Sequence, residues 1–331
     1  PPVVAKKNVV FTAHTGSGKT LAYTAGILGR INTKQGLQAL VIVPTRELCV
    51  QVGKEIKKVC EPLRINVGVL YGGRDFSGDY RTLNKKNHIL VATPGRIIAH
   101  INDKHIKVGE VKHIIYDESD QMFDQGFYDD CVYLKTRASK EAQIILSSAT
   151  ITPKVQSFIT KEIGTYELLR IGELIPTGII QEKLYCEKNE KNAILLDKLT
   201  TLKGQTIIFC NTKVKTTSIA DHLTHHKMNA KPLSSDLDQE QRLNRLNLFK
   251  DGKITVLVTT DVAARGLHIK DVANVVNYDV PTRTEFFVHR IGRTGRNGKK
   301  GYALTFICPE DVDRMKEVEE TYKVNVKEIT S

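Results

Sequence analysis

The chain has 331 residues, which is long for a single hydrophobic core and predicts two domains. Its composition, 40% hydrophobic and 26% charged, is that of a folded protein and excludes a largely disordered chain. Lysine plus arginine number 49 against 37 for aspartate plus glutamate, a formal charge of +12. This excess indicates either a polyanionic partner such as nucleic acid or a solvated basic surface.

Cysteine spacing and hydropathy exclude two further classes. None of the six cysteines forms a C-x-x-C pair or belongs to a Cys/His cluster with zinc spacing, so we expect buried thiols in a reducing compartment. No apolar run reaches the ~18 residues of a membrane span. The chain opens on PPVVAKKNVV and passes straight into a strand, so we expect no signal peptide. We expect a cytoplasmic monomer without membrane contact, and import into an organelle stays open.

Short apolar, β-branched runs recur between amphipathic segments and predict strands. They lie at residues 8–13, 39–44, 66–71, 88–93, 113–118, 143–150, 205–212, 254–261, 274–279 and 302–307. This rhythm predicts an α/β fold with two domains, each a parallel sheet with helices on both faces. Gly172, Pro176 and Gly178 favour a linker at 171–180, between domains at 1–170 and 181–331.

The stretch VVFTAHTGSGKT runs from the first predicted strand into a glycine-rich turn at residues 14–20, which we call the phosphate turn. We expect a helix to begin near Lys19, so that its N-terminus and the turn present backbone amides to phosphate oxygens. Lys19 is expected to reach the β- and γ-phosphates, and the Thr20 hydroxyl to bind Mg²⁺. The residues predicted to hold the nucleotide are His14, Thr15, Gly16, Ser17, Gly18, Lys19 and Thr20.

Two carboxylates, Asp117 and Glu118, directly follow the predicted strand at 113–116. In an open parallel sheet, ligands collect at the carboxyl ends of the strands. We expect Asp117 to hold Mg²⁺ through water and Glu118 to orient or deprotonate an attacking water. The alternative is a loop of acids that caps the next helix; the phosphate turn nearby favours the catalytic interpretation.

Nine strings carry a resemblance to one family: AHTGSGKT, PTREL, GG, TPGR, DESD, SAT, FCNT, TTDVAARGL and HRIGRTGR. Their order and rough spacing over residues 8–308 resemble the DEAD-box RNA helicases. The resemblance implies two RecA-like domains, with ATP and Mg²⁺ in the cleft and RNA lying across both. It gives the phosphate turn, Asp117 and Glu118 the roles derived above.

The resemblance also assigns residues of the second half to the nucleotide. Arg293 and Arg296 resemble arginine fingers that reach the γ-phosphate. The alternative is a basic face that binds RNA, since with Arg290 they are spaced by three and would share one face of a helix. Gly266 and His268 are assigned to the nucleotide as well. A coupling role between domains is implied for Asp120, Ser148, Thr150 and His289; without the resemblance, Ser148 and Thr150 fit a turn.

Contacts to RNA are assigned to loops that follow strands in both halves. Their hydroxyls, amides and guanidinium groups suit phosphate and ribose, so we expect binding independent of base sequence and a preference for RNA over DNA. Taken singly, each residue also fits a cap or turn. With no Trp and 6% aromatics, no stacking platform is evident. The assigned residues are Pro44, Thr45, Arg46, Gly72, Gly73, Arg74, Thr93, Pro94, Gly95, Arg96, Asn211, Thr212, Lys213, Gln239, Arg242, Thr259 and Thr260.

The expected function is that of an RNA-dependent ATPase, a helicase that separates short RNA duplexes when ATP closes two domains. The alternative is an ATP-gated RNA clamp or scaffold with little unwinding; a kinase lacks an acceptor site and leaves the second domain unexplained. Protein partners are not specified.

Four features depart from the family pattern. The segment that reads adenine is not contained in the residues before the phosphate turn, and Ser119 stands where alanine is usual. Ser234 and Ser235 replace His-Gly. His268 replaces an aspartate that meets the ribose.

The His268 substitution generates a prediction. Because imidazole replaces a carboxylate at the ribose, we expect weaker, pH-dependent ATP binding that His268→Asp strengthens. Titration of both proteins with ATP measures this, and equal affinities contradict it.

Overall fold

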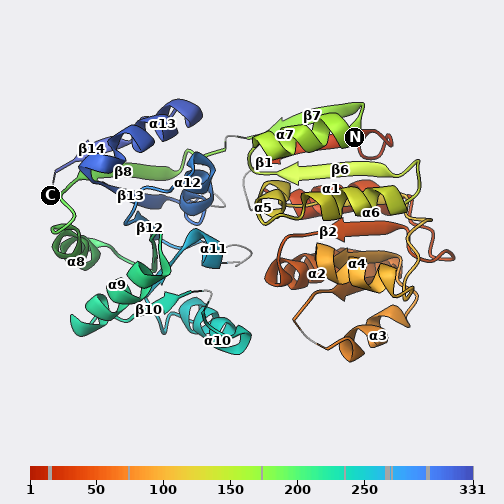
Figure 1. Cartoon of the computed structure of the whole chain (residues 1–331), viewed down its shortest axis with the longest axis horizontal. Coiled ribbons are helices and arrows are strands. Elements are labelled where there is room, and N and C mark those ends of the chain that lie inside the picture. Colours follow the sequence, from red (N-terminus) through yellow and green to blue (C-terminus); the bar gives the residue numbers. More distant parts are fainter. Residues whose placement is uncertain are drawn as a thin grey trace. The chain divides into compact units, whose positions relative to one another are not determined.

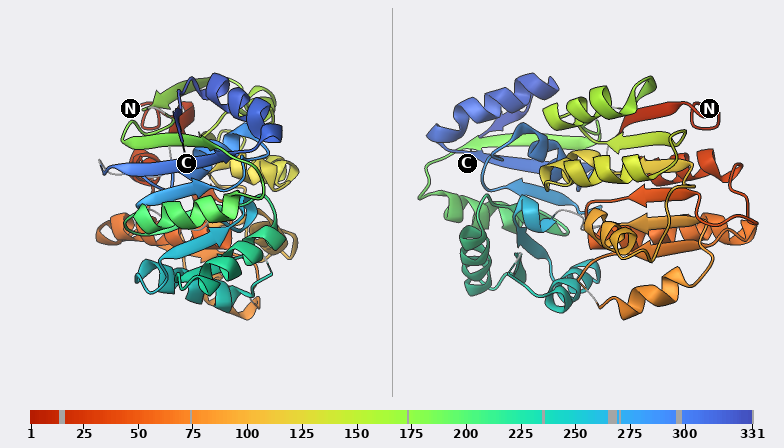
Figure 2. Two further views of the ribbon diagram at one scale, coloured as in Figure 1. Left: turned by 90° about the vertical axis from the view of Figure 1, so that its left-hand side faces the viewer. Right: turned by 45° about the vertical axis from the view of Figure 1, so that its right-hand side comes forward.

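The computed structural model describes two compact units, Pro1–Gly172 and Glu173–Ser331 (Figure 1). The described residues are 1–13, 17–73, 75–172, 174–234, 236–264, 269, 271–295 and 299–330, without the side chain of Gln239. Each unit contains one sheet of seven parallel strands. The strands run between helices, as Figure 2 shows from two further directions. The expected α/β fold, with a helix-covered parallel sheet in each of two units, is confirmed.

The N-terminal sheet has the strand order β3-β4-β2-β5-β6-β1-β7. Its strands are β1 (Asn8–Ala13), β2 (Ala39–Ile42), β3 (Val67–Leu70), β4 (Ile89–Ala92), β5 (His113–Tyr116), β6 (Gln143–Ser148) and β7 (Tyr166–Ile171). Its α-helices are α1 (Lys19–Leu28), α2 (Arg46–Cys60), α3 (Ser77–Leu83), α4 (Pro94–Asn102), α5 (Ser119–Asp124), α6 (Tyr128–Arg137) and α7 (Pro153–Phe158). A 3-10 helix, η1 (Glu61–Leu63), follows α2, and a π-helix, η2 (Ile159–Ile163), follows α7. Since β5, β6 and β1 are consecutive neighbours, the carboxyl ends of these three strands lie side by side.

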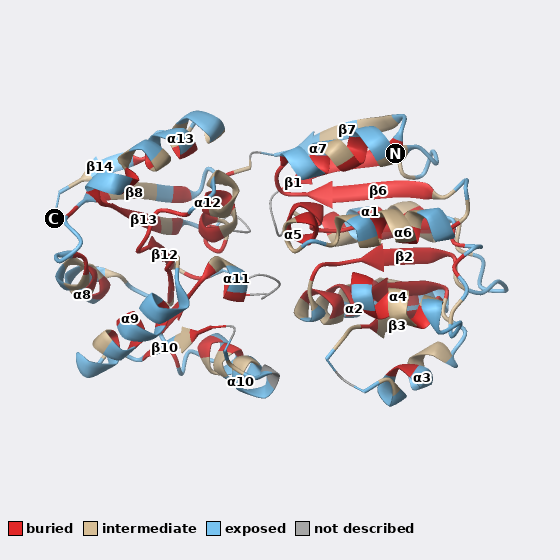
Figure 3. Cartoon of the chain, in the orientation of Figure 1, coloured by how far each residue is buried: buried red, intermediate tan, exposed pale blue. Residues whose placement is uncertain are grey.

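Alternate residues of the central strands enter two cores on opposite faces of the N-terminal sheet. Leu40 and Ile42 of β2 pack with helices α4 to α7 on one face. Val41 packs with α1 and α2 on the other. Figure 3 shows the resulting pattern, in which buried strands run between helices whose outer faces are exposed. Burial on both faces explains why these strands are continuously apolar rather than alternating.

The C-terminal sheet has the order β10-β11-β9-β12-β13-β8-β14. Its strands are β8 (Ile179–Tyr185), β9 (Thr206–Phe209), β10 (Ala230–Leu233), β11 (Val256–Thr259), β12 (Asn274–Asn277), β13 (Gly301–Ile307) and β14 (Lys327–Ile329). Its helices are α8 (Lys191–Thr201), α9 (Lys213–His225), α10 (Gln239–Lys250), α11 (Asp261–Ala264), α12 (Thr284–Ile291) and α13 (Val312–Tyr322), with η3 (Pro309–Asp311). Helices α10, α12 and α13 cover one face, and α8 and α9 the other.

All ten predicted strands are present, and α1 begins at Lys19 as predicted. Four strands were not predicted: β7, β8, β10 and β14. Three of them, β7, β10 and β14, are edge strands with short or half-exposed sequences, so they lack the apolar run of a central strand. In the region predicted as a linker, β7 ends at Ile171 and β8 begins at Ile179.

The six cysteines are buried free thiols, as expected. Burial raises the pKa of Cys60 and of Cys186 to about 11, which keeps both thiols protonated and unreactive at neutral pH. Among the described residues, no helix combines the length and the apolar character that crossing a membrane requires.

A buried histidine makes the stability of the N-terminal unit sensitive to acid. His113 begins β5, and its Nδ1 donates to Oε1 of Gln143 on β6 at 3.1 Å. Burial, with Arg30 nearby, lowers its pKa to about 4. The folded state therefore holds His113 neutral, and stability present above pH ~6.5 is lost as pH falls toward 4.

We predict that lowering the pH from about 7.5 to about 4.5 removes roughly 2–3 kcal/mol through His113, because the unfolded chain binds the proton more readily. His113→Gln retains a side-chain donor without titrating and should show a correspondingly smaller loss. Urea unfolding at both pH values measures the difference. Equal acid sensitivity of the two proteins would remove His113 as the cause.

Candidate nucleotide and RNA sites

A lysine side chain lies at the carboxyl end of β1. Gly18 precedes α1 with φ of +85°, a conformation that glycine adopts without a steric penalty. Lys19 is only 8% exposed, and its Nζ donates to the carbonyl of Ala13 at 2.8 Å. Its ammonium group thus lies where the amino end of α1 meets the end of β1, an arrangement suited to phosphate. His14, Thr15 and Gly16 lie outside the described residues.

Three donors hold the carboxylate of Asp117 at the end of β5. Oδ2 accepts from the hydroxyl of Tyr23 on α1 at 3.0 Å. Oδ1 accepts from Ser147 Oγ on β6 at 2.7 Å and from the backbone N–H of Glu118 at 3.0 Å. Burial, the charge of Asp117 and the hydrogen bond to it raise the pKa of Tyr23 well above its usual value, so the phenol remains a donor.

Tyr23 and Ser147 are the site residues that the sequence analysis missed. Tyr23 follows Lys19 by four residues and therefore lies on the same side of α1. Ser147 precedes Ser148, for which the resemblance implies a coupling role. The sequence signal for Ser147 was a hydroxyl within the otherwise apolar run of β6. Its partner Asp117, directly after β5, could be identified only from the order of the strands in the sheet.

The acidic segment DESD turns sharply into α5. Glu118 has φ of +52°, a left-handed conformation uncommon for a residue with a side chain, and such residues cluster at functional sites. Ser119 is fully buried, and its hydroxyl donates to the carbonyl of Ser147 at 3.0 Å. The hydroxyl that replaces the usual alanine is therefore satisfied, and it ties α5 to β6.

The structure brings together the three residues of the N-terminal unit for which the resemblance implies a coupling role. Oδ2 of Asp120 accepts from both the backbone N–H and the hydroxyl of Thr150, each at 2.9 Å. Ser148 Oγ donates to the carbonyl of Thr150 at 2.7 Å and accepts from the N–H of Asp120. His289, the fourth residue, lies half-buried on α12 of the other unit.

Arg46 and the glycine pair form one surface in the N-terminal unit. Thr45 caps α2 by accepting from the N–H of Leu48, and Pro44 before it is buried. Gly73 has φ of +79°, and a Cβ there would lie 1.7 Å from Nη1 of Arg46. Only glycine leaves room for that guanidinium group, so Arg46, Gly72 and Gly73 lie together. Arg74 lies outside the described residues.

The segment Thr93–Arg96 divides into backbone and side-chain functions. Thr93 and Pro94 begin α4, and the space beside Gly95 is open. Arg96, in contrast, is 8% exposed and donates from Nε to Oδ2 of Asp79 on α3 at 2.5 Å. Its guanidinium group also lies 3.8 Å from the ring centroid of Phe76. The side chain of Arg96 therefore ties α4 to α3.

The expectation that three arginines share one helix face is wrong. Helix α12 ends at Ile291, and Gly292 and Gly295 shape the turn that follows, Gly295 with φ of +66°. Arg290 is fully buried and points into its own unit. Arg293 lies in the turn and is 9% exposed. Arg296 lies outside the described residues, as do Gly266 and His268.

Arg290 is the centre of a buried polar network. Its guanidinium group donates to both carboxylate oxygens of Asp261 at 2.7 Å, to Oδ1 of Asn211 at 2.9 Å and to the carbonyl of Asp279 at 2.7 Å. It joins the ends of β9, β11 and β12, which are neighbouring strands. Such a bidentate, desolvated ion pair fixes the geometry of the strand ends.

Asp279 is a further residue that the sequence analysis missed. It accepts from the N–H of Asn211 at 3.0 Å and from Lys215 at 2.8 Å, and Lys191 is 3.3 Å away. Burial by itself raises the pKa of this carboxyl, but the donation from Asn211 and the two lysines outweigh it and lower the pKa. The carboxylate therefore stays charged and holds Asn211 in place. Its position directly after a strand was the available signal.

The remaining predicted RNA contacts of the C-terminal unit shape the same edge. Thr212 caps α9, and Thr260 accepts from the N–H of Ala263 at the start of α11. Thr259 Oγ1 donates to the carbonyl of Leu233 at 3.0 Å, and Arg242 Nη2 donates to the carbonyl of Ala263 at 2.7 Å. Lys213 is exposed and pairs with Asp236 at 2.7 Å. Gln239 begins α10.

The Arg290 network leads to a stability prediction. Arg290→Met should destabilise the C-terminal unit by about 3–5 kcal/mol, because Asp261 is left charged without its partner. Arg314→Met is the control, since Arg314 forms a partly exposed pair with Asp311 worth about 0–1 kcal/mol. Urea unfolding of both variants measures the free energies. Similar losses would show that Arg290 is not the centre of the network.

Comparison with known protein families identifies the family to which this chain is similar. The family described as DEAD/DEAH box helicase matches residues 1–158, and the helicase conserved C-terminal domain matches residues 190–298. The DEAD-box ATP-dependent RNA helicase CshA of Geobacillus kaustophilus is 37% identical over 327 residues, covering 98% of this chain and 70% of that protein. The ATP-dependent RNA helicase CshA of Listeria monocytogenes is 39% identical over 321 residues, covering 96% and 62%. The chain thus spans 62% to 70% of the length of these two relatives.

Solved structures similar to this chain include members of the same family. S. cerevisiae Dbp5 bound to RNA and ADP BeF3 aligns with a TM-score of 0.86 at 28% identity, covering 98% of this chain and 85% of that chain. A DEAD box protein from Methanococcus jannaschii aligns with a TM-score of 0.58 at 33% identity, covering 99% and 90%. On the family matches and the extent of identity, the chain belongs to the DEAD-box ATP-dependent RNA helicase family.

Proposed function

We propose that this chain is an RNA-dependent ATPase that separates short RNA duplexes. The observation that carries the proposal is the buried group at the ends of β1, β5 and β6, where Lys19 lies beside the phosphate turn and Asp117 is held by Tyr23 and Ser147. Phosphoryl transfer requires a cation near the phosphates and an oriented carboxylate for the metal. Lys19 at the amino end of α1 supplies the cation, and Asp117 at the end of β5 supplies the carboxylate.

In this proposal, Lys19 and the turn from His14 to Thr20 bind the phosphates of ATP. Asp117 and Thr20 would hold Mg²⁺, which supplies neutralisation of charge on the β- and γ-phosphates. The donor set fits, because an ionised carboxylate and a hydroxyl are hard oxygen ligands and the described residues around Asp117 offer it only neutral donors. Glu118 orients or deprotonates the attacking water. Arg293 and Arg296 stabilise the charge that develops on the transferred group, and Gly266 and His268 contact the nucleotide.

We propose further that RNA is bound through phosphate and ribose by the loops at the carboxyl ends of the strands. Arg46 with Gly72 and Gly73, and the amino end of α4 at Thr93–Gly95, supply cationic and amide groups in the N-terminal unit. Asn211, Thr212 and Lys213 supply them in the other. The RNA in the Dbp5 complex supports RNA as the ligand.

The proposed mechanism depends on closing and reopening the two domains. ATP and RNA together favour a closed arrangement of domains 1–170 and 181–331, joined by a linker at 171–180. Asp120, Ser148, Thr150 and His289 couple the domains. Closure bends one RNA strand away from its complement, and hydrolysis followed by phosphate release reopens the cleft. The six buried free thiols support a cytoplasmic location, and we propose a monomer.

The alternative is an ATP-gated RNA clamp, which His268 in place of the usual aspartate favours. Persistent RNA binding with a non-hydrolysable ATP analogue, without release of the complementary strand from a short duplex, would support the clamp and reject unwinding.

The proposed ATPase has a direct test. Single-stranded RNA should raise ATP turnover, and Lys19→Ala, Glu118→Gln and Arg296→Ala should each lower the stimulated rate by at least ~10²-fold, because each removes charge or proton transfer needed in the transition state. Lys34→Ala, which changes an exposed lysine, should stay within about twofold. Equal turnover with and without RNA would end the claim of RNA dependence.

A further inference from the structure

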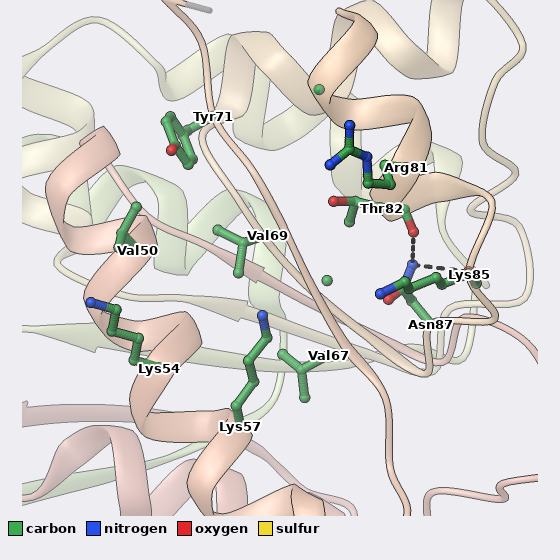
Figure 4. Close-up of a pocket in the computed structure, with 12 residues that line it drawn as sticks. Val50, Lys54, Lys57, Val67, Val69, Tyr71, Arg81, Thr82, Lys85 and Asn87 are labelled. Carbon is green, nitrogen blue, oxygen red and sulfur yellow. Dashed lines mark hydrogen bonds between the residues drawn. The ribbon is translucent and has the colours of Figure 1, made fainter.

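We propose that the N-terminal unit has a second RNA-binding site, a basic pocket at the free edge of its sheet. Here the basic pocket means the cavity of about 520 Å³ between α2, β3 and α3 (Figure 4). Lys54 and Lys57 on α2 line it from one side, and Arg81 and Lys85, on α3 and the turn after it, from the other. The site binds phosphates of an RNA strand that continues past the loops proposed above. The inference rests on the proposed function in taking RNA as the ligand and the loops proposed above as its path.

The charged side chains that line the basic pocket are all positive. All four cations are exposed, and no carboxylate is among the described residues that line the cavity. Within the described chain, none of the four takes part in an ion pair. Four like charges around one cavity repel one another, and an anion bound between them relieves that repulsion. The pocket is therefore suited to a polyanion rather than to a neutral ligand.

Close packing of α2 and α3 against β3 shapes the walls. A Cβ on Gly53 of α2 would lie 2.5 Å from Val69, and one on Gly68 of β3 would lie within 3 Å of Leu90, Asn87 and Thr82. Both glycines thus allow an approach that any side chain would prevent. Asn87 Nδ2 donates to the carbonyls of Thr82 and Lys85, at 2.7 and 3.0 Å, which fixes the turn that carries Lys85.

A buried ion pair anchors the α3 wall. Asp79 of α3 is fully buried, and its Oδ2 contacts both Arg96 Nε at 2.5 Å and His100 Nε2 at 2.9 Å, the latter two on α4. Since helix α3 has only seven residues, this attachment rather than helix propensity holds it in place. Arg81 is thereby presented to the cavity from a fixed element, which lowers the entropy lost when a ligand binds.

Continuity with the proposed RNA loops identifies the ligand. Tyr71 lines the basic pocket and is followed directly by Gly72 and Gly73, which pack with Arg46. A strand leaving those glycines along the sheet edge passes over Tyr71, whose ring can stack with a base, and reaches the four cations. Val67 and Val69 provide an apolar floor suited to sugar and base faces. An acidic peptide would also satisfy the charges, but it does not explain this continuity.

The test compares two variants of the full chain with equal loss of charge. The pocket variant carries Lys54→Gln, Lys57→Gln, Arg81→Gln and Lys85→Gln. The control variant changes four exposed lysines in the same unit, outside the pocket: Lys104→Gln, Lys107→Gln, Lys140→Gln and Lys161→Gln. Affinity for labelled oligouridylates of increasing length is measured by fluorescence anisotropy at several salt concentrations.

The pocket variant should bind the shortest oligouridylate that stimulates ATP turnover within about twofold of the unchanged chain, because that RNA does not reach the pocket. It should lose the gain in affinity that longer RNA gives. The slope of log affinity against log salt for the long RNA should fall by about 3, since each phosphate contact to a single strand contributes ~0.7. The control variant should keep both the gain and most of the slope.

Equal dependence on length and salt in the two variants would overturn the proposal. So would competition by an acidic peptide, polyglutamate, that binds the unchanged chain but not the pocket variant while the RNA length dependence is unaltered. If the fourfold change lowers the thermal unfolding temperature, Lys57→Glu and Arg81→Glu are tested singly against Lys107→Glu. Failure of the proposed function is distinguishable, because it would appear as ATP turnover that no RNA length stimulates.

Discussion

Burying the carboxylate of Asp117 is the constraint on which the N-terminal unit is organised. An ionised group with 3% exposure is stable only if hydrogen bonds replace its lost water. Tyr23 and Ser147 supply them from α1 and β6, and the backbone of Glu118 supplies the third. Each donor comes from an element that also carries a residue of the proposed nucleotide or coupling sites. Satisfying this one buried carboxylate therefore fixes α1, the acidic segment and β6 relative to one another.

The C-terminal unit buries a cation, Arg290, and surrounds it with hydrogen-bond acceptors. Arg290 is desolvated, and Asp261, Asn211 and the carbonyl of Asp279 surround it at the ends of three neighbouring strands. In both units the polar groups gather at the carboxyl edge of a parallel sheet, where strand ends leave backbone groups without ladder partners. The interiors of central strands such as β2, β4 and β11 are apolar on both faces. Polar function and hydrophobic stability thus occupy different parts of the same strands.

Arginines of two motifs, PTREL and TPGR, differ in their exposure and in their partners. Arg46 stays exposed against Gly73, whereas Arg96 is buried against Asp79. The two differ in their neighbours: Arg46 starts a helix beside a glycine pair, and Arg96 faces the short helix α3. The buried Arg96 can therefore hold a wall of the proposed basic pocket in place through Asp79. This division links the buried pair at Asp79 to the cations of the basic pocket.

Sequence alone determined the features that depend on local chemistry. Continuous apolar runs identified ten strands because central strands are buried on both faces, and the glycine-rich turn located the start of α1 at Lys19. Tertiary structure decided what depends on partners distant in the chain. Edge strands such as β7 and β10 become strands through pairing, Tyr23 and Ser147 meet Asp117 only because β1, β6 and β5 are neighbours, and Arg290 is turned inward by the end of α12. The physical reason is that periodicity and turn chemistry act over a few residues, whereas burial and charge pairing depend on strand order.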